Sequence, residues 1–266
     1  MNRKIKNLKN QQILLLQGPM GSFFKKMQLD LLKNNLVYRI GFNKGDEFYS
    51  LKYNFYPYRD NLREWRSFIN LFIKNKKINI IFLFGDCRLY HSIAIEEAKN
   101  LNVDVYVFEE GYIRPNYITL EKNGVNFHSE IISNRNQILN QIKIDNNNIL
   151  YPKNFSRKYT FLKMAFQSFL YYLISNIYKF QYPNYSHHRE FSVITEIKYA
   201  IINVSRLLKN KILEFKFEKV FKKKYKNKYY LVPLQTYNDS QVINHSRYNS
   251  IEEFIEEVLI SFSKFE

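Results

Sequence analysis

The sequence predicts an α/β protein built on a parallel sheet. Short apolar runs rich in β-branched and aromatic residues stop on glycines and polar residues, and apolar residues at helical spacing follow them. Strand, glycine turn, helix and strand in succession is the βαβ pattern of a parallel sheet. Ligands of such sheets bind beyond the carboxyl ends of the strands, so the polar residues after each run are the candidate site residues.

The first βα unit lies near the amino terminus. Ile13–Leu16 is the expected strand, and Gln17, Gly18 and Gly21 belong to the turn before a helix expected over 23–34. The turn lacks the Gly-Lys-Ser/Thr ending of a P-loop and is no full dinucleotide fingerprint. On its own it marks a tight turn. Its functional interpretation is a helix N-terminus that offers free N–H groups to an anionic acceptor or phosphate.

The second strand, Ile78–Phe84, ends on Gly85 and the side chains of Asp86, Cys87 and Arg88. Asp86 and Arg88 are candidate ligand-binding residues, although the two can simply pair with each other. A helix is expected over 92–100. His91, at its start, is more often a hydrogen-bonded structural histidine than a functional one.

The third strand, Val103–Phe108, ends on two adjacent carboxylates, Glu109 and Glu110. Neighbouring side chains of an extended segment point to opposite faces, so only one of the two can reach a given cleft. Glu110, next to a glycine, is our candidate for the general base that faces the cleft. Downstream, a hairpin turn is expected at 122–124, after which His128 and Ser129 either line the same cleft or cap a surface turn.

The last apolar run, Tyr229–Leu234, is expected to be a strand and stops on a dense set of short polar side chains. A carboxylate among several hydrogen-bonding groups suits a nucleophile or a general base, and Asp239 is the candidate nucleophile. The alternative is an ordinary turn after a strand, which the spacing alone favours. A helix follows over about 250–264. The polar residues in question are Gln235, Asn238, Asp239, Ser240 and Gln241.

Composition agrees with a folded protein of one or two domains. The chain has 266 residues, 45% of them hydrophobic and 17% aromatic, which is enough for a sizeable core. Seven glycines and six prolines leave no flexible linker. The single cysteine, Cys87, excludes an intrachain disulfide framework and is compatible with a reducing cytoplasm. No secretory signal is expected, because the apolar run after the basic amino terminus is too short.

Positive charge is concentrated in residues 151–230, which hold 17 Lys and Arg against four Glu, a net charge of +13 out of +17. Within this segment Phe161–Phe180 is aromatic and apolar but too interrupted for a transmembrane span of about 20 residues. Either it lies as a helix in a membrane interface or it is buried between two domains. The lysines of 222–228 suit a solvated loop or an anionic lipid surface better than nucleic acid.

Five motifs in order make the chain resemble the capsule polysaccharide biosynthesis and export family, whose single-module members are retaining β-Kdo glycosyltransferases of ABC-transporter-dependent capsule systems. The resemblance extends from about residue 13 to the carboxyl terminus. The motifs are Gln17-Gly18-Pro19-Met20-Gly21-Ser22-Phe23-Phe24, Gly85-Asp86-Cys87-Arg88, Phe108-Glu109-Glu110-Gly111-Tyr112-Ile113-Arg114-Pro115, His187-His188-Arg189 and Pro233-Leu234-Gln235 with Asn238-Asp239-Ser240-Gln241.

The resemblance implies a two-Rossmann-domain (GT-B-like) glycosyltransferase. Residues 1–150 are then a complete amino-terminal Rossmann-like domain on the acceptor side, 151–228 a basic helical connector, and 229–266 the start of a nucleotide-sugar-binding domain that is only begun. The family pattern continues into a second half with a His-Pro motif, and no His-Pro occurs in this sequence. The chain is therefore expected to be truncated.

The resemblance also implies a reaction and a place. The donor is CMP-Kdo and the acceptor a lipid-linked glycan or the phospholipid terminus of the capsule, at the cytoplasmic face of the inner membrane, with other capsule proteins as possible partners. Neither a cofactor nor a metal is implied. Asp239 and Glu110 are the expected catalytic residues, and Arg114 and His188 join the expected substrate-binding residues.

Two other functions stay open at this point. One is a catalytically silent fragment or assembly partner in capsule export, and the other is a basic protein that binds membranes or nucleic acid. The silent fragment or assembly partner differs from the transferase in lacking a donor-binding half, which is the absence that the sequence leads us to expect.

Overall fold

The computed structural model describes residues 8–111, 117–134, 157–185, 193–225, 228–235, 242 and 244–262. The chain divides into two compact units, Met1–His188 and Arg189–Glu266. The predicted two-domain glycosyltransferase arrangement and the predicted domain boundaries stay predictions.

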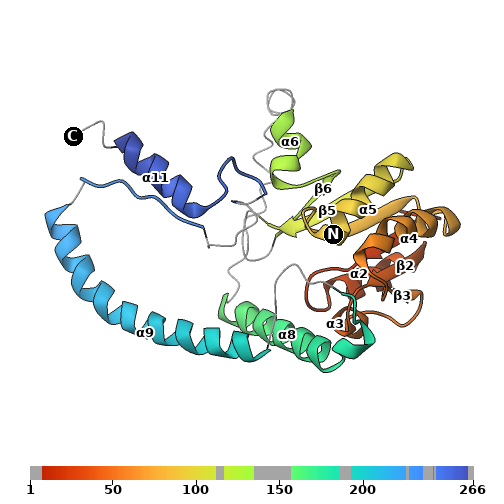
Figure 1. Ribbon diagram of the computed structural model, residues 1–266, viewed down its shortest axis with the longest axis horizontal. Helices are drawn as coiled ribbons and strands as arrows, with labels where there is room; N and C mark the ends of the chain where they lie inside the picture. Colours follow the sequence, from red (N-terminus) through yellow and green to blue (C-terminus); the bar gives the residue numbers. More distant parts are fainter. Residues whose placement is uncertain are drawn as a thin grey trace, which may run out of the picture. The chain divides into compact units, whose positions relative to one another are not determined.

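The first unit is an α/β domain with one six-stranded mixed sheet, which confirms the predicted fold class (Figure 1). The strand order is β3-β2-β1-β4-β5-β6. All pairs are parallel except β5 with β6, in which Glu110 lies opposite Ile118. The strands are β1 (Gln12–Leu16), β2 (Leu36–Gly41), β3 (Phe55–Pro57), β4 (Ile80–Phe84), β5 (Asp104–Glu110) and β6 (Ile118–Lys122).

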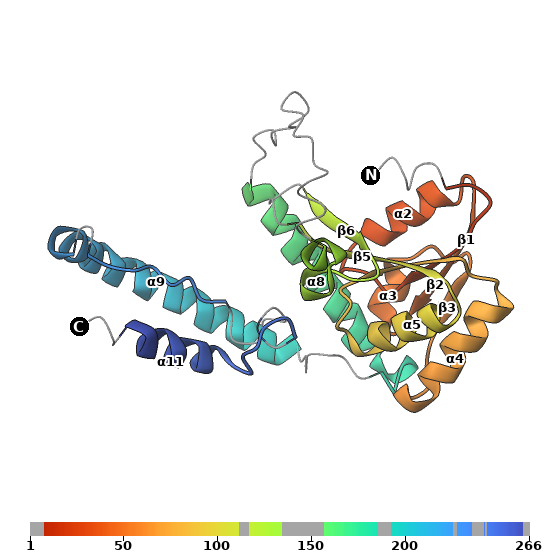
Figure 2. The ribbon, with the colours of Figure 1, turned by 90° about the horizontal axis from the view of Figure 1, so that it is seen from above.

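Helices cover both faces of this sheet because alternate residues of each strand point to opposite sides. In β1, Ile13 and Leu15 pack with α2 (Phe23–Leu31). Leu14 and Leu16 pack on the other side with α4 (Leu62–Asn75) and α5 (Leu89–Asn100). Figure 2 shows these helices on opposite sides of the strands. Buried on both faces, β1 is a continuous apolar run, which is why the sequence revealed it.

The remaining elements of this unit are short except for one helix. They are α3 (Lys44–Phe48), the 3-10 turn η1 (Asn126–His128), α6 (Glu130–Ser133), the long helix α8 (Arg157–Ile177) and the 3-10 turn η3 (Lys179–Gln181). The expected hairpin at 122–124 is wrong, because β6 pairs back onto β5 and the turn after it leads into η1 instead of a further strand.

The second unit contains the helices α9 (Val193–Lys224) and α11 (Ile251–Phe262). The helix expected over 250–264 is thereby confirmed. The strand expected at Tyr229–Leu234 is wrong, because residues 228–235 form no strand and Leu231 is 81% exposed. An extended segment needs a neighbouring strand to bond its backbone groups, and the described part of this unit offers none.

Candidate functional site

Polar side chains gather where β1, β2, β4 and β5 end, which we call the carboxyl edge of the sheet. Gln17 follows β1, Asp86 and Arg88 follow β4, and Glu109 and Glu110 end β5. Parallel strands place their carboxyl ends side by side, so residues up to 93 positions apart in sequence meet at one edge. This is the convergence that the sequence predicted for these residues.

Gln17 is held tightly after β1. Its backbone has a left-handed φ of 51°, its side chain is buried, and its N–H donates to Ile40 O at 2.8 Å. The side-chain amide donates to Asp46 Oδ2 at 3.2 Å and to the Tyr185 hydroxyl at 3.1 Å. A buried non-glycine residue with positive φ is held by its surroundings at a conformational cost, and such residues cluster at functional sites.

Gly18 and Gly21 are positions where a side chain would collide. Both have positive φ, at 136° and 114°. A Cβ at residue 18 would lie 2.8 Å from the Phe24 ring, and one at residue 21 would lie 2.6 Å from Gln167 Oε1 of α8. These glycines let α2 and α8 approach the turn. Their predicted part in substrate binding stays a prediction.

Asp46, which sequence reasoning missed, is a buried carboxylate beneath Gln17. It accepts hydrogen bonds from Phe42 N at 2.9 Å, from Gln17, and from the Tyr171 hydroxyl of α8 at 3.0 Å. Burial raises its pKa, although these hydrogen bonds and the charge of buried Arg39 act in the opposite direction. The one sequence signal was Asn43 three positions earlier, whose side chain caps α3 by accepting from Asp46 N.

Arg88 points its guanidinium toward the turn after β1. Nη1 lies 3.4 Å from both Gln17 Oε1 and Gly18 O, which makes two long hydrogen bonds. A Cβ at Gly85 would lie 3.7 Å from Arg88 Nε and equally far from Glu109 Oε2, so these two charged side chains flank the same glycine. An arginine held beside a carboxylate and a backbone turn suits the binding of an anionic group.

The two β5 glutamates differ in their surroundings. Glu109 is half-buried, and burial raises its pKa, while the charge of Arg88 lowers it and that of Asp86 adds to the rise. Glu110 is exposed. Glu109 is therefore the glutamate that faces the Asp86 and Arg88 side chains. The predicted role of Glu110 as general base stays a prediction.

Asp86 is buried and serves as an acceptor for three groups. Oδ2 accepts from Val125 N at 3.0 Å and lies 3.1 Å from His128 Nδ1, and Oδ1 accepts from the Cys87 thiol at 3.3 Å. Burial by itself raises the pKa of this carboxyl, but the hydrogen bonds outweigh it and hold the pKa below its ordinary value. Asp86 is thus a stable anion.

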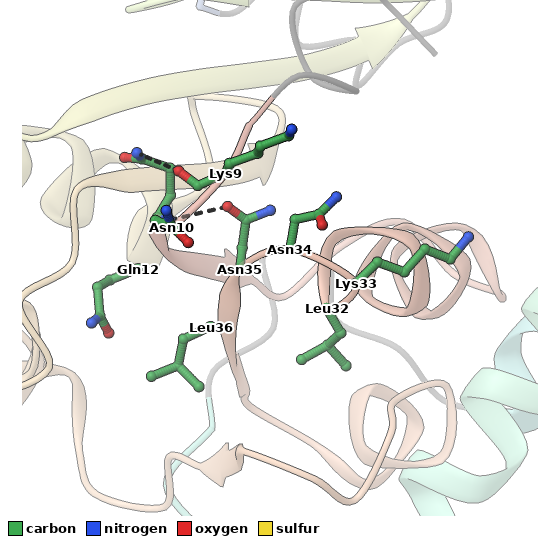
Figure 3. A pocket seen from close by; sticks show the side chains of 9 residues that line it. Lys9, Asn10, Gln12, Leu32, Lys33, Asn34, Asn35 and Leu36 are labelled. Atoms are coloured by element: carbon green, nitrogen blue, oxygen red, sulfur yellow. Dashed lines mark hydrogen bonds between the residues drawn. The ribbon is translucent and has the colours of Figure 1, made fainter.

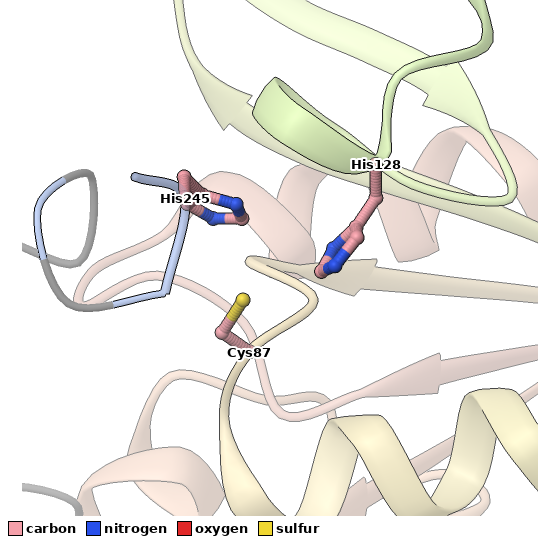
Figure 4. Close-up of side chains that lie close together, drawn as sticks. All are labelled: Cys87, His128 and His245. Atoms are coloured by element: carbon pink, nitrogen blue, oxygen red, sulfur yellow. The ribbon is translucent and has the colours of Figure 1, made fainter. Parts of the chain in front are cut away.

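Cys87, after the end of β4, and His128, in η1, both contact Asp86. Figure 4 shows the Cys87 and His128 side chains close together. Burial, followed by the charge of Asp86, raises the pKa of the Cys87 thiol to about 12, so the thiol stays protonated at neutral pH and is a poor nucleophile.

His128 and Ser129 were expected either to line the cleft or to cap a surface turn, and the structure places one residue in each position. His128 contacts Asp86 at the carboxyl edge, whereas Ser129 caps α6 by accepting from Ile131 N. His91 is buried, with Nδ1 2.8 Å from Gly85 O, as expected of a structural histidine.

Five of the predicted site residues lie outside the described residues. Gln235 is described and is exposed in the second unit. Those outside are Arg114, His188, Asn238, Asp239 and Ser240.

A pocket of about 580 Å³ lies at the opposite, amino edge of the sheet. Figure 3 shows the two segments that line it, Lys9–Gln12 leading into β1 and Leu32–Leu36 leading into β2. Gln11 N donates to Asn35 Oδ1 at 3.0 Å between them. Because ligands of parallel sheets bind at the carboxyl ends of the strands, we assign no function to this pocket.

The surroundings of α8 bear on membrane association. Its Tyr171 and Ser175 face α3, while Leu162, Phe166 and Phe169 are exposed. Among the described helices, none is long and apolar enough to cross a membrane.

Comparison with known proteins finds one family model and several relatives. Residues 79–266 match the model described as "Capsule polysaccharide biosynthesis protein". The chain is 33% identical over 259 residues to the capsule polysaccharide export protein KpsS of Escherichia coli, covering 97% of this chain and 65% of that protein. It is 33% and 32% identical to the capsule polysaccharide modification protein LipB of Neisseria meningitidis serogroups A and B, covering 96% of this chain and 61% of each. No solved structure matches. The chain therefore spans less than two thirds of the length of these relatives.

Proposed function

The chain belongs to the capsule polysaccharide biosynthesis family, and within that family we propose that it transfers β-Kdo from CMP-Kdo to a phospholipid-linked capsule acceptor. One observation carries the proposal. Asp86, Arg88 and Glu109, which belong to motifs that resemble those of the capsule polysaccharide biosynthesis family, converge at the carboxyl edge of the parallel strands. That edge is where α/β proteins bind ligands.

The charges at this edge suit an anionic substrate, which is either the phosphate of the phospholipid-linked acceptor or CMP-Kdo. CMP-Kdo carries a phosphate and a sugar carboxylate, both of which an arginine can bind in a charge-assisted way. Arg88 lies beside the turn of Gln17 and Gly18, and the N-terminus of α2 follows this turn. Backbone N–H groups at a helix N-terminus add to the attraction for an anion.

Retention of configuration calls for two displacements at the anomeric carbon or an equivalent front-face route, and we propose the two displacements. In the first, a carboxylate oxygen of Asp239 bonds to that carbon and the bond to the phosphate oxygen of CMP breaks, so that CMP leaves with the electron pair. In the second, the acceptor oxygen bonds to the same carbon and the carboxylate of Asp239 is released. The acceptor hydroxyl loses a proton in this step, and Glu110 is the sequence-based candidate to receive it.

The lipid-linked acceptor favours action at a membrane surface. We include in the proposal a peripheral position on the cytoplasmic face of the inner membrane, next to other proteins of the capsule machinery. The exposed side chains of Leu162, Phe166 and Phe169 on α8 and the basic residues of 151–230 support it, because apolar side chains combined with lysines favour an anionic lipid surface.

Release of CMP tests this function directly. The purified chain is incubated with CMP-Kdo, with and without a phospholipid-linked acceptor, and both CMP and the glycosylated lipid are quantified. The proposal expects CMP and glycosylated lipid in equal amounts. Absence of both, for a chain shown to be folded by circular dichroism, would reject it.

A further inference from the structure

Asp86 and His128 form a carboxylate–imidazole pair that the sequence did not assign to catalysis. Asp86 Oδ2 and His128 Nδ1 are 3.1 Å apart, and Asp86 remains ionised because its hydrogen bonds hold its pKa low. An ionised carboxylate can only accept hydrogen bonds, so Nδ1 carries the proton. The other ring nitrogen of the neutral imidazole, Nε2, is then the basic one.

The segment that carries His128 is fastened on both sides. Before it, Val125 is fully buried and its N–H donates to the same Asp86 oxygen. After it, the Ser129 hydroxyl donates to Glu121 of β6. Gly124 is in close contact with His128, since a Cβ at 124 would lie 2.6 Å from the histidine Cβ. The imidazole is therefore oriented by its backbone as well as by Asp86.

The pair also lies where a substrate can reach it. The His128 side chain is 51% exposed, whereas the Asp86 side chain beneath it is 5% exposed. Glu109, beside Arg88, interacts with the charge of Asp86. A buried carboxylate behind an accessible imidazole is the arrangement by which enzymes orient a general base.

We propose that His128 is the general base of the transfer, with Asp86 as the residue that positions it. This inference rests on the proposed function. As the acceptor oxygen bonds to the anomeric carbon, its proton passes to Nε2 of His128, the bond from that carbon to the leaving group breaks with its electron pair going to the leaving group, and the imidazolium then releases the proton to water. In this assignment His128 takes the place of Glu110, the sequence-based candidate for the same proton.

The pairing can be tested without turnover. Long-range ¹H–¹⁵N NMR of the imidazole nitrogens distinguishes the two neutral tautomers, and His128→Gln identifies the His128 signals. The proposal expects the Nδ1–H tautomer in the wild-type chain and its loss in Asp86→Ala. Asp104→Asn, which breaks an exposed ion pair with Lys122, is the control and should leave the tautomer unchanged. An Nε2–H tautomer in the wild-type chain would overturn the pairing.

Catalysis is tested on the same variants in the CMP-Kdo assay. His128→Gln should lower transfer by about 10²- to 10⁴-fold, the usual contribution of a general base, while the exposed-site control Ile131→Ala keeps the wild-type rate. Full transfer by folded His128→Gln would overturn the inference and leave the proposed function intact. If the wild-type chain itself transfers nothing, the proposed function fails and with it the catalytic assignment, while the NMR result still decides the pairing.

Discussion

The Tyr171 hydroxyl of α8 donates a 3.0 Å hydrogen bond to the buried carboxylate of Asp46 in α3. The two residues are 125 positions apart in the sequence. Asn43 Nδ2 donates to the same hydroxyl at 2.6 Å, and Asp46 in turn accepts from Gln17. A buried polar network therefore links the docking of α8 to the turn after β1, where the candidate site begins.

Removal of the Tyr171 hydroxyl should destabilise the first unit. Tyr171→Phe leaves Asp46 and Asn43 each without one buried partner, which costs about 1–3 kcal/mol. Urea denaturation should show this loss in the free energy of unfolding. Tyr53→Phe, at an exposed tyrosine, is the matched control and should unfold like the wild-type chain. Equal stability of Tyr171→Phe and the control would show that the hydroxyl is not needed.

Asp46 should make stability depend on pH. Because its pKa is raised in the folded state, its contribution to stability is present below the ordinary Asp pKa of about 3.9 and is lost as the pH rises through the folded value. Asp46→Asn removes this titration while keeping hydrogen-bonding atoms. We expect the decrease in unfolding free energy between low and neutral pH to be smaller in Asp46→Asn than in the wild-type chain. A larger decrease in the variant would contradict the sign of the shift.

The sequence predicted the sheet well where strands are uniformly apolar. The strands expected at 13–16, 78–84 and 103–108 are β1, β4 and β5, and the polar residues that follow them meet at one edge. β2 was not predicted, because Arg39 interrupts its apolar run. Arg39 is nevertheless buried, with Nη1 donating to Tyr49 O at 2.7 Å, and burial lowers its pKa to about 10.

Long-range contacts account for what the sequence could not reveal about the site. The pairing of Asp86 with His128 joins residues 42 positions apart through the return of β6, and no local pattern encodes it. The choice between Glu109 and Glu110 likewise depends on which one faces Arg88 in the folded chain. The strand expected at Tyr229–Leu234 had the right composition but has no neighbouring strand among the described residues.

The exposed aromatic residues of α8 should support binding to anionic lipid. Phe166 and Phe169 are exposed, and burial of each phenylalanine in a lipid interface contributes about 1.5–3 kcal/mol. Phe166→Ser with Phe169→Ser should therefore weaken binding to vesicles that contain phosphatidylglycerol by at least about tenfold in flotation assays. Leu71→Ser, at an exposed leucine of α4, is the control.

Salt gives a second test of lipid binding. Screening shortens the range of electrostatic attraction to about 3 Å at 1 M salt, so the lysine-dependent part of the affinity should fall as salt is added. Equal binding to neutral and anionic vesicles at low salt would contradict the electrostatic contribution. Binding that the two phenylalanine substitutions leave unchanged would place the lipid contact elsewhere.

Asp239→Ala should abolish transfer without unfolding the chain. In the proposed reaction its carboxylate forms the covalent bond to the anomeric carbon, and no other group supplies that bond. CMP release in the presence of acceptor should fall to background, while circular dichroism and thermal unfolding match the wild-type chain. Turnover at the wild-type rate would remove Asp239 from the mechanism.

The anomeric configuration of the product tests the proposed function most directly. The chain is incubated with CMP-Kdo and a phospholipid-linked acceptor, and the glycosidic linkage of the isolated product is determined by NMR. Two displacements at the anomeric carbon predict a β-linked Kdo residue. An α-linked product, or no product from a folded chain, would contradict the proposal.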